Sequence, residues 1–215
     1  ETLATTGSTT GFRADSEGAG NAGGIFIKAH QIKLTDGAMM SSSASGTGAA
    51  GSITILADTL AISGKPSKMS ALSGSIFAFS AAAGNSGNIL IDAHQIILNN
   101  GAISNLTLGS GTGGTISIST DSLTISEAGG IAANSLGETE TAGDAGNIHI
   151  QANTIKMNSG VIITAATNAA GGDITITMPR QVDLHKLLFG EGGNTSTTPI
   201  LLYLQQGEIA TNVKG

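Results

Sequence analysis

A short pattern, Gly-x-Ile-x-Ile, occurs six times along the chain and limits its possible folds more than any other feature. The Ile residues alternate with other residues, which indicates β-strands because successive side chains of a strand point to opposite faces. A single unit cannot bury its own Ile pair, whereas stacked units cover one another and complete their backbone hydrogen bonds. The pattern therefore predicts coils that stack along an axis. Its copies begin at Gly23, Gly51, Gly87, Gly114, Gly146 and Gly172.

Two further alternating segments follow within each unit. We predict a second strand with an inward pair of residues, and then a third strand that follows a glycine. The second pairs are Ile32 and Leu34, Leu60 and Ile62, Ile96 and Leu98, Leu123 and Ile125, Ile155 and Met157, and Val182 and Leu184. The third pairs are Met39 and Ser41, Ile76 and Ala78, Ile103 and Asn105, Ile131 and Ala133, Ile162 and Thr164, and Ile209 and Thr211. The sequence thus predicts an all-β fold, a right-handed parallel β-helix (solenoid) of about six turns of three short strands.

The repeat also sets the expected domain organisation. We expect residues 1–215 to form a single β-helix domain that is a segment of a longer chain. Residues 185–206 interrupt the pattern and are expected to form an irregular inserted loop, and Lys65–Ser73 a shorter insertion. Leu3–Thr6 are expected to be the third strand of an earlier turn. The recurrent glycines fit corners where φ is positive or where the chain passes close to its neighbour.

The composition excludes several classes of protein. Charged residues make up 11% of the chain, the formal net charge is -6, and there is no Cys. Because binding to phosphate groups needs clustered Lys and Arg, we expect no nucleic acid among the partners. The apolar runs are shorter than the roughly 18 residues of a membrane-spanning helix. Glycine shows no three-residue period, which excludes collagen.

One column of residues brings titratable side chains to the same place in successive units. His30, Asp58, His94, Asp121 and Asn153 each follow the first strand. Stacked residues lie about 5 Å apart, so histidine and carboxylate groups could approach one another or a metal ion. A metal site needs three or four converging ligands, and a solvated corner is the simpler interpretation. We therefore assign no metal-binding residue and expect no cofactor.

The outward columns also bear on two other functions, catalysis and ice binding. Enzymes that process polysaccharides need clustered carboxylates, whereas Asp58, Asp92 and Asp121 fall in different columns or in alternate turns. We therefore assign no catalytic residue and expect that the chain is not an enzyme. Outward Ser and Thr could organise water and bind ice, but their column is too irregular to match a lattice. It reads Phe26, Thr54, Leu90, Ser117, His149 and Thr175.

The longer pattern Gly-Asn-Ile-x-Ile-x-Ala-x-x-Ile-x-Leu-x-x-Gly-x-Ile spans 87–103 and, with Met157 in place of Leu, 146–162. It resembles the repeat of filamentous haemagglutinin-like large exoproteins of two-partner secretion, in particular the cyanobacterial ones. The resemblance covers about 20–184 and again 207–212. It implies a parallel β-helix, export through an outer-membrane two-partner transporter, and a secreted fibre at the outer cell surface. The amino-terminal secretion domain of such proteins has no counterpart in this sequence.

These observations favour a non-catalytic, structural or adhesive segment of an extracellular fibre. The expected partners are a host-cell, glycan or matrix surface and other copies of the chain, through end-to-end or lateral association. The alternatives are an ice-binding or a polysaccharide-processing β-helix protein. Loops on repeat scaffolds often carry recognition, so Lys65–Ser73 and Leu187–Tyr203 are candidate contact segments.

Overall fold

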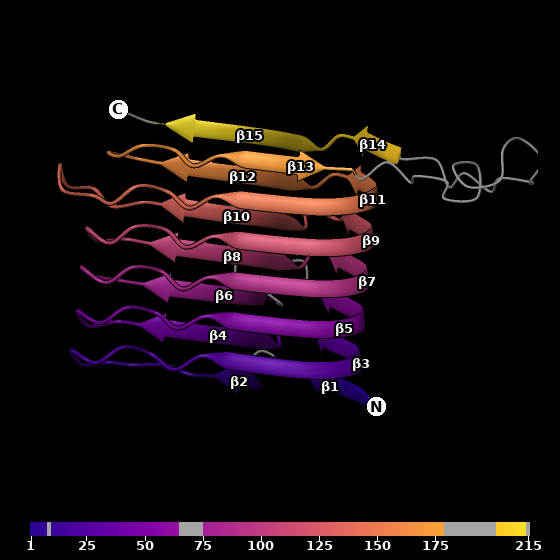
Figure 1. The fold of residues 1–215 in the computed structure, drawn as a ribbon, viewed down its shortest axis with the longest axis horizontal. Coiled ribbons are helices and arrows are strands. Elements are labelled where there is room, and N and C mark those ends of the chain that lie inside the picture. Colours follow the sequence, from indigo (N-terminus) through magenta and orange to yellow (C-terminus); the bar gives the residue numbers. More distant parts are fainter. Residues whose placement is uncertain (8–9, 65–74, 179–200, 214–215) are drawn as a thin grey trace, which may run out of the picture.

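The computed structural model describes residues 1–7, 10–64, 75–178 and 201–213, which form two parallel sheets (Figure 1). Over these ranges the chain contains strands and no helix. Sheet A consists of β1 (Thr2–Thr6), β3 (Ile25–Thr35), β5 (Ile53–Ser63), β7 (Ile89–Asn99), β9 (Ile116–Ser126), β11 (Ile148–Asn158), β13 (Ile174–Thr177) and β14 (Leu201–Gln205). Sheet B consists of β2 (Gly11–Arg13), β4 (Met39–Ala44), β6 (Ser75–Ser80), β8 (Ala102–Thr107), β10 (Gly130–Ser135), β12 (Val161–Ala166) and β15 (Glu208–Val213).

The chain alternates between the two sheets, so each coil adds one strand to each of them. In Figure 1 the coils rise from the N-terminal end to the C-terminal end. The nearer strands run from left to right and the farther strands return from right to left, which makes the path right-handed. The predicted right-handed parallel β-helix is confirmed.

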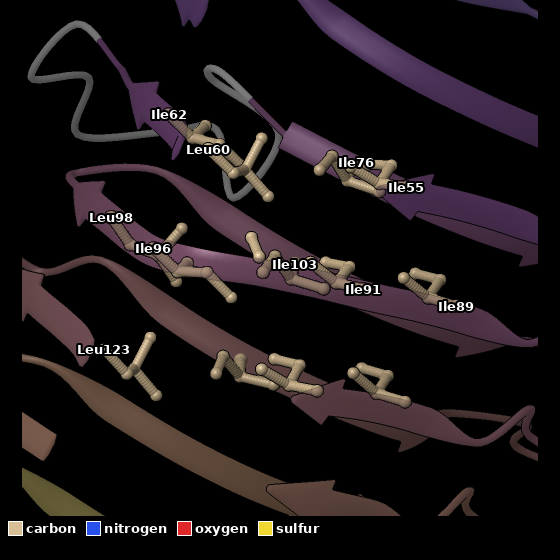
Figure 2. Close-up of a cluster of buried hydrophobic side chains, with 14 of the residues drawn as sticks. Ile55, Leu60, Ile62, Ile76, Ile89, Ile91, Ile96, Leu98, Ile103 and Leu123 are labelled. Carbon is tan, nitrogen blue, oxygen red and sulfur yellow. The ribbon is translucent and has the colours of Figure 1, made fainter. Parts of the chain in front are cut away.

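The Ile pairs of the repeat form the core. Ile55, Ile91, Ile118 and Ile150 are register partners from one coil to the next, and each is at most 3% exposed. Figure 2 shows Ile91 of β7 beside Ile103 of β8, so the two sheets share one apolar interior. Burying a side chain of this size contributes about 1.5–3 kcal/mol, which makes these columns the main source of stability.

The first and second predicted strands of each unit are one continuous strand in the structure. Each long strand from β3 to β11 has eleven residues, and its pairing register omits one position near the middle. That position is His30 in β3 and His94 in β7, where the chain turns a corner without leaving the sheet. A coil therefore has two strands and not three, because a single unpaired residue is enough to turn the corner.

The loops between sheet B and the next long strand close the third side of each coil. Their backbones are bonded from coil to coil, for example from the Ser86 N–H to the Thr112 carbonyl at 2.9 Å. Asn85 Oδ1 accepts the Thr112 N–H, and Asn147 Oδ1 accepts the Asp173 N–H. These loops are therefore stacked parts of the solenoid.

Close approach explains the glycines that open the repeat. A Cβ atom on Gly51, Gly87, Gly114, Gly146 or Gly172 would lie 1.9–2.2 Å from the carbonyl oxygen of the equivalent glycine in the preceding coil. None of these glycines has a positive φ. Positive φ occurs instead at the corner after the long strand, at residues such as Asp36 and Asn100, whose side chains tolerate that region. Close approach is therefore the role of the glycines that open the repeat, whereas positive φ is found at Gly7, Gly11 and Gly37.

Several predicted positions need correction. Leu3–Thr6 belong to β1, whose partner is the second half of β3 with Leu3 opposite Ile32, so they are a second strand and not a third. In β4 the inward pair is Met40 and Ser42, because Met40 is opposite Ile76. Both Met39 and Met40 are apolar, so alternation alone left the phase of this strand ambiguous.

The predicted loop 185–206 also differs in part from the structure. Its residues 201–205 form β14, which pairs with the second half of β11 and places Leu202 opposite Ile155. This is the place that we predicted for Val182 and Leu184, which lie outside the described residues. Residues 185–200 and Lys65–Ser73 lie outside them too. β14 follows the same alternating pattern as a regular second strand, so the interruption ends before Leu201.

Candidate functional site

The predicted column of His, Asp and Asn side chains forms a chain of hydrogen bonds along the corner of sheet A. His30 Nδ1 lies 2.8 Å from Asp58 Oδ2, and His94 Nδ1 lies 2.9 Å from Asp121 Oδ2. Asn153 Nδ2 donates to Asp121 Oδ1 at 2.9 Å. The side chains of both His residues are 76% exposed. The expected approach of histidine and carboxylate groups is confirmed, at a solvated corner.

The electrostatics of this column favour the charged form of His94. Its hydrogen bond to Asp121 raises the pKa of His94 above the ordinary value of 6.5, and the negative charge of Asp121 adds to the effect. Desolvation lowers this pKa in part, and the charges of Asp58 and Asp92 make smaller contributions that raise it. Protonated His94 is thus stabilised by three carboxylates, although its exposure to water keeps each interaction weak.

The structure describes no metal site in this column. Across residues 1–7, 10–64, 75–178 and 201–213, no group of three or more His, Asp or Glu side chains is arranged to hold a metal ion. The column forms two separate groups, the pair His30 and Asp58 and the group of His94, Asp121 and Asn153.

The carboxylates of the corner lie as the sequence predicted. Asp92 is opposite Leu56 and Ser119, one column away from Asp58 and Asp121. Asp58 and Asp121 belong to β5 and β9, with β7 between them.

A shallow groove follows the first halves of the long strands, a feature that the sequence did not reveal. Its first part, about 630 Å³, is lined by Glu1, Lys28, Ala29, His30, Leu56, Ala57, Asp58, Asp92 and His94. Its second part, about 320 Å³, is lined by Leu90, Ser117, Ile118, Ser119, His149, Ile150, Gln151, Thr175 and Thr177. The two parts share no lining residue, and β7 supplies Asp92 to the first and Leu90 to the second. They are therefore two neighbouring hollows that follow one another along the stacked strands, and we call them together the groove.

Exposed apolar side chains stand beside these polar groups. Phe26 is 67% exposed and Leu90 is 46% exposed, and Thr54 separates them in one outward column. The predicted column from Phe26 to Thr175 is confirmed in register, and it mixes apolar, hydroxyl and imidazole groups. The sequence contains one indication of a contact surface here, because large apolar residues occupy outward positions, where a strand face in water is usually polar.

No family model, no curated protein and no solved structure matches the chain. In the described ranges there is also no helix with the length and hydropathy to cross a membrane.

Proposed function

We propose that the chain is a structural and adhesive β-helix rod that holds an extended glycan along the groove of sheet A and carries no chemistry of its own. The observation that carries the proposal is the groove itself. Its two hollows together extend from Lys28 to Thr177, a span of roughly 24 Å for stacked strands about 4.8 Å apart. A linear polymer fits such a groove better than a compact small molecule does.

The lining of the groove suits a sugar chain. Ser119, Gln151 and Thr177 offer hydroxyl and amide groups that donate and accept hydrogen bonds. Leu90 and the nearby Phe26 give exposed apolar surface against which the apolar face of a sugar ring packs. The strands that carry the groove are held on a buried apolar core, so the groove should keep its shape before a ligand binds and little conformational entropy should be lost on binding.

The proposal includes a location outside the cell, in a secreted fibre exported by a two-partner transporter. The resemblance of 87–103 and 146–162 to haemagglutinin-like exoproteins supports this part. An antibody against the chain tests it on the source cells. We expect labelling of intact cells or of the culture medium, and label confined to the cytosol would overturn this part alone.

Binding of polysaccharides to the immobilised chain tests the adhesive role. We expect a panel of neutral, acidic and sulfated polysaccharides to contain at least one that is retained, and we expect Leu90→Ser to reduce its retention about tenfold. Leu136→Ser is the matched control, because Leu136 is equally exposed but lies outside the groove. No retention by any polysaccharide, or an equal loss in both variants, would overturn the proposed role of the groove.

Two further measurements on the same protein separate the alternatives. Shortening of a polysaccharide during incubation would replace the adhesive role with a polysaccharide-processing activity. Thermal hysteresis in a freezing experiment would replace it with ice binding. We expect neither result.

A further inference from the structure

The outer face of sheet B carries no charge over the four strands from β6 to β12, whereas Arg13 of β2 and Glu208 of β15 point outward at its two ends. The outward residues of β6, β8, β10 and β12 alternate with the buried ones along each strand. They are Phe77, Phe79, Ala102, Ser104, Leu106, Gly130, Ala132, Asn134, Val161, Ile163 and Ala165, and we call them the sheet B face. By contrast, the outward positions of sheet A include Lys28, Lys33 and Asp92. The outer face of sheet A is therefore charged along its length, whereas charge on sheet B is confined to its two end strands.

The apolar character continues past the ends of the sheet B strands. Leu108 and Leu136 follow β8 and β10 directly, and each is 43% exposed. The backbone bonds from Leu108 to Ser80 and from Leu136 to Thr107 hold them in adjacent coils. Large exposed apolar side chains that gather on one face indicate a contact surface.

We propose that the sheet B face is a self-association surface on which a second copy of this chain packs face to face. The face suits its own copy because it is uncharged, and two chains of net charge -6 repel least where neither carries a charge. A twofold arrangement presents the same patch on both copies, so the sheet B face packs against itself. The strands run nearly parallel with little twist in Figure 1, which allows flat sheets to stack.

The area of the face sets the expected strength of association. The four strands β6, β8, β10 and β12, at about 4.8 Å each and six residues wide at about 3.3 Å per residue, cover roughly 380 Å² per copy. Two copies would then bury roughly 760 Å² together, which is the size of a weak, transient interface. We therefore expect a reversible dimer with a dissociation constant on the order of hundreds of micromolar. The test of self-association is independent of the test of glycan binding, because the groove lies on sheet A and the proposed contact surface on sheet B.

Sedimentation equilibrium of the full chain over a range of concentrations tests the proposal. We expect the mass to rise from 21.2 kDa toward twice that value. Ile163→Lys and Ala132→Lys place a charge on the sheet B face and should weaken association about tenfold or more. Thr124→Lys on sheet A is the matched control and should associate like the original chain, because Thr124 points outward from β9. Circular dichroism checks that all three variants are folded.

A single cysteine gives a second, independent measurement, since the chain has no Cys of its own. We expect a short bis-maleimide to link Ala132→Cys into a covalent dimer and to leave Thr124→Cys monomeric. A mass that stays at 21.2 kDa up to about 1 mM would overturn the proposal, as would full dimerisation of Ile163→Lys. The proposal would also be overturned if the chain stays monomeric and shows thermal hysteresis that Ile163→Lys abolishes. That result would mean that the sheet B face binds ice.

Discussion

Asn105 shows how a single residue can oppose the packing around it. It is fully buried in β8, and neither its Nδ2 nor its Oδ1 has a hydrogen-bond partner in the described part of the chain. Its column partners in the adjacent coils are Ala78 and Ala133. An amide buried without partners costs about 1–3 kcal/mol, so this position reduces the stability of the coil.

We predict that Asn105→Ala raises the free energy of unfolding by about 1 kcal/mol, because it removes the unpaired amide and matches its neighbours in the column. Thermal or urea unfolding measures the change. Thr164→Ala is the matched control in the same column. Its hydroxyl donates to the Gly172 carbonyl at 2.7 Å, so its loss should lower stability. A large loss of stability in Asn105→Ala would mean that the amide has a partner after all.

His94 is the residue at which the charge of the corner column can be measured directly. We predict that Asp121→Asn lowers the pKa of His94 toward 6.5, because it removes both the hydrogen bond and the charge that raise it. An NMR titration of the imidazole protons reports this pKa. Glu138→Gln, which changes an exposed acid in a loop, should leave it unchanged. If Asp121→Asn also had no effect, the pair would not form in solution.

The raised pKa of His94 also predicts the direction of a pH effect on stability. The folded state binds the proton more tightly than the unfolded state, so the contribution is fully present below pH 6.5. It is lost as the pH rises through the folded-state pKa. The side chain is exposed, so the effect on the melting temperature is small, and it should disappear in Asp121→Asn.

At the scale of an element, the stacked loops depend on glycine for space and not for φ. A Cβ atom on Gly146 would lie 1.9 Å from the carbonyl oxygen of Gly114. We predict that Gly146→Ala lowers the free energy of unfolding by about 3 kcal/mol or more, because two backbones must move apart. Chemical unfolding measures the loss. Gly18→Ala, whose Cβ would meet no atom within 4 Å, should change stability by less than about 0.5 kcal/mol.

Equal effects in Gly146→Ala and Gly18→Ala would show that the coils are farther apart than the structure has them. The same comparison explains why the glycines recur. One backbone lies directly above another in this loop, and the column tolerates no side chain.

At the scale of the whole molecule, the last coil joins two strands from separate parts of the chain. Thr177 of β13 is opposite Gln151, and Leu201 of β14 is opposite Thr154. Only two positions of β11 lie between these partners. We predict that deletion of residues 180–200 leaves residues 178 and 179 to span the corner and produces one eleven-residue strand.

The shortened chain should keep its β circular dichroism and its cooperative unfolding, and its melting temperature should change little. A deletion of the same length that removes β9 and the adjoining corner, residues 110–130, serves as the control and should destroy the stack. Complete loss of structure on removal of 180–200 would show that this segment contributes to folding.

Much of the fold followed from the sequence, because alternation of Ile with polar residues fixes which side of a strand is buried. Ile91, Ile118 and Ile150 needed no structural information to be placed in one column. The His30 and Asp58 contact was predictable for the same reason, since equal positions in equal repeats stack. The unpaired amide of Asn105 could not be predicted, because a buried polar residue usually finds a partner.

Alternation could not decide where a repeat is interrupted or how far it is shifted. Leu202 takes a place in sheet A that Val182 fits equally well by sequence. In β4 the inward residue is Met40 and not Met39, a shift of one residue. Only the tertiary structure resolved these choices, because pairing with the preceding coil selects one register among several with the same pattern. It also produced the groove on sheet A and the uncharged sheet B face. Both are surfaces assembled from different coils, and no single stretch of sequence contains them.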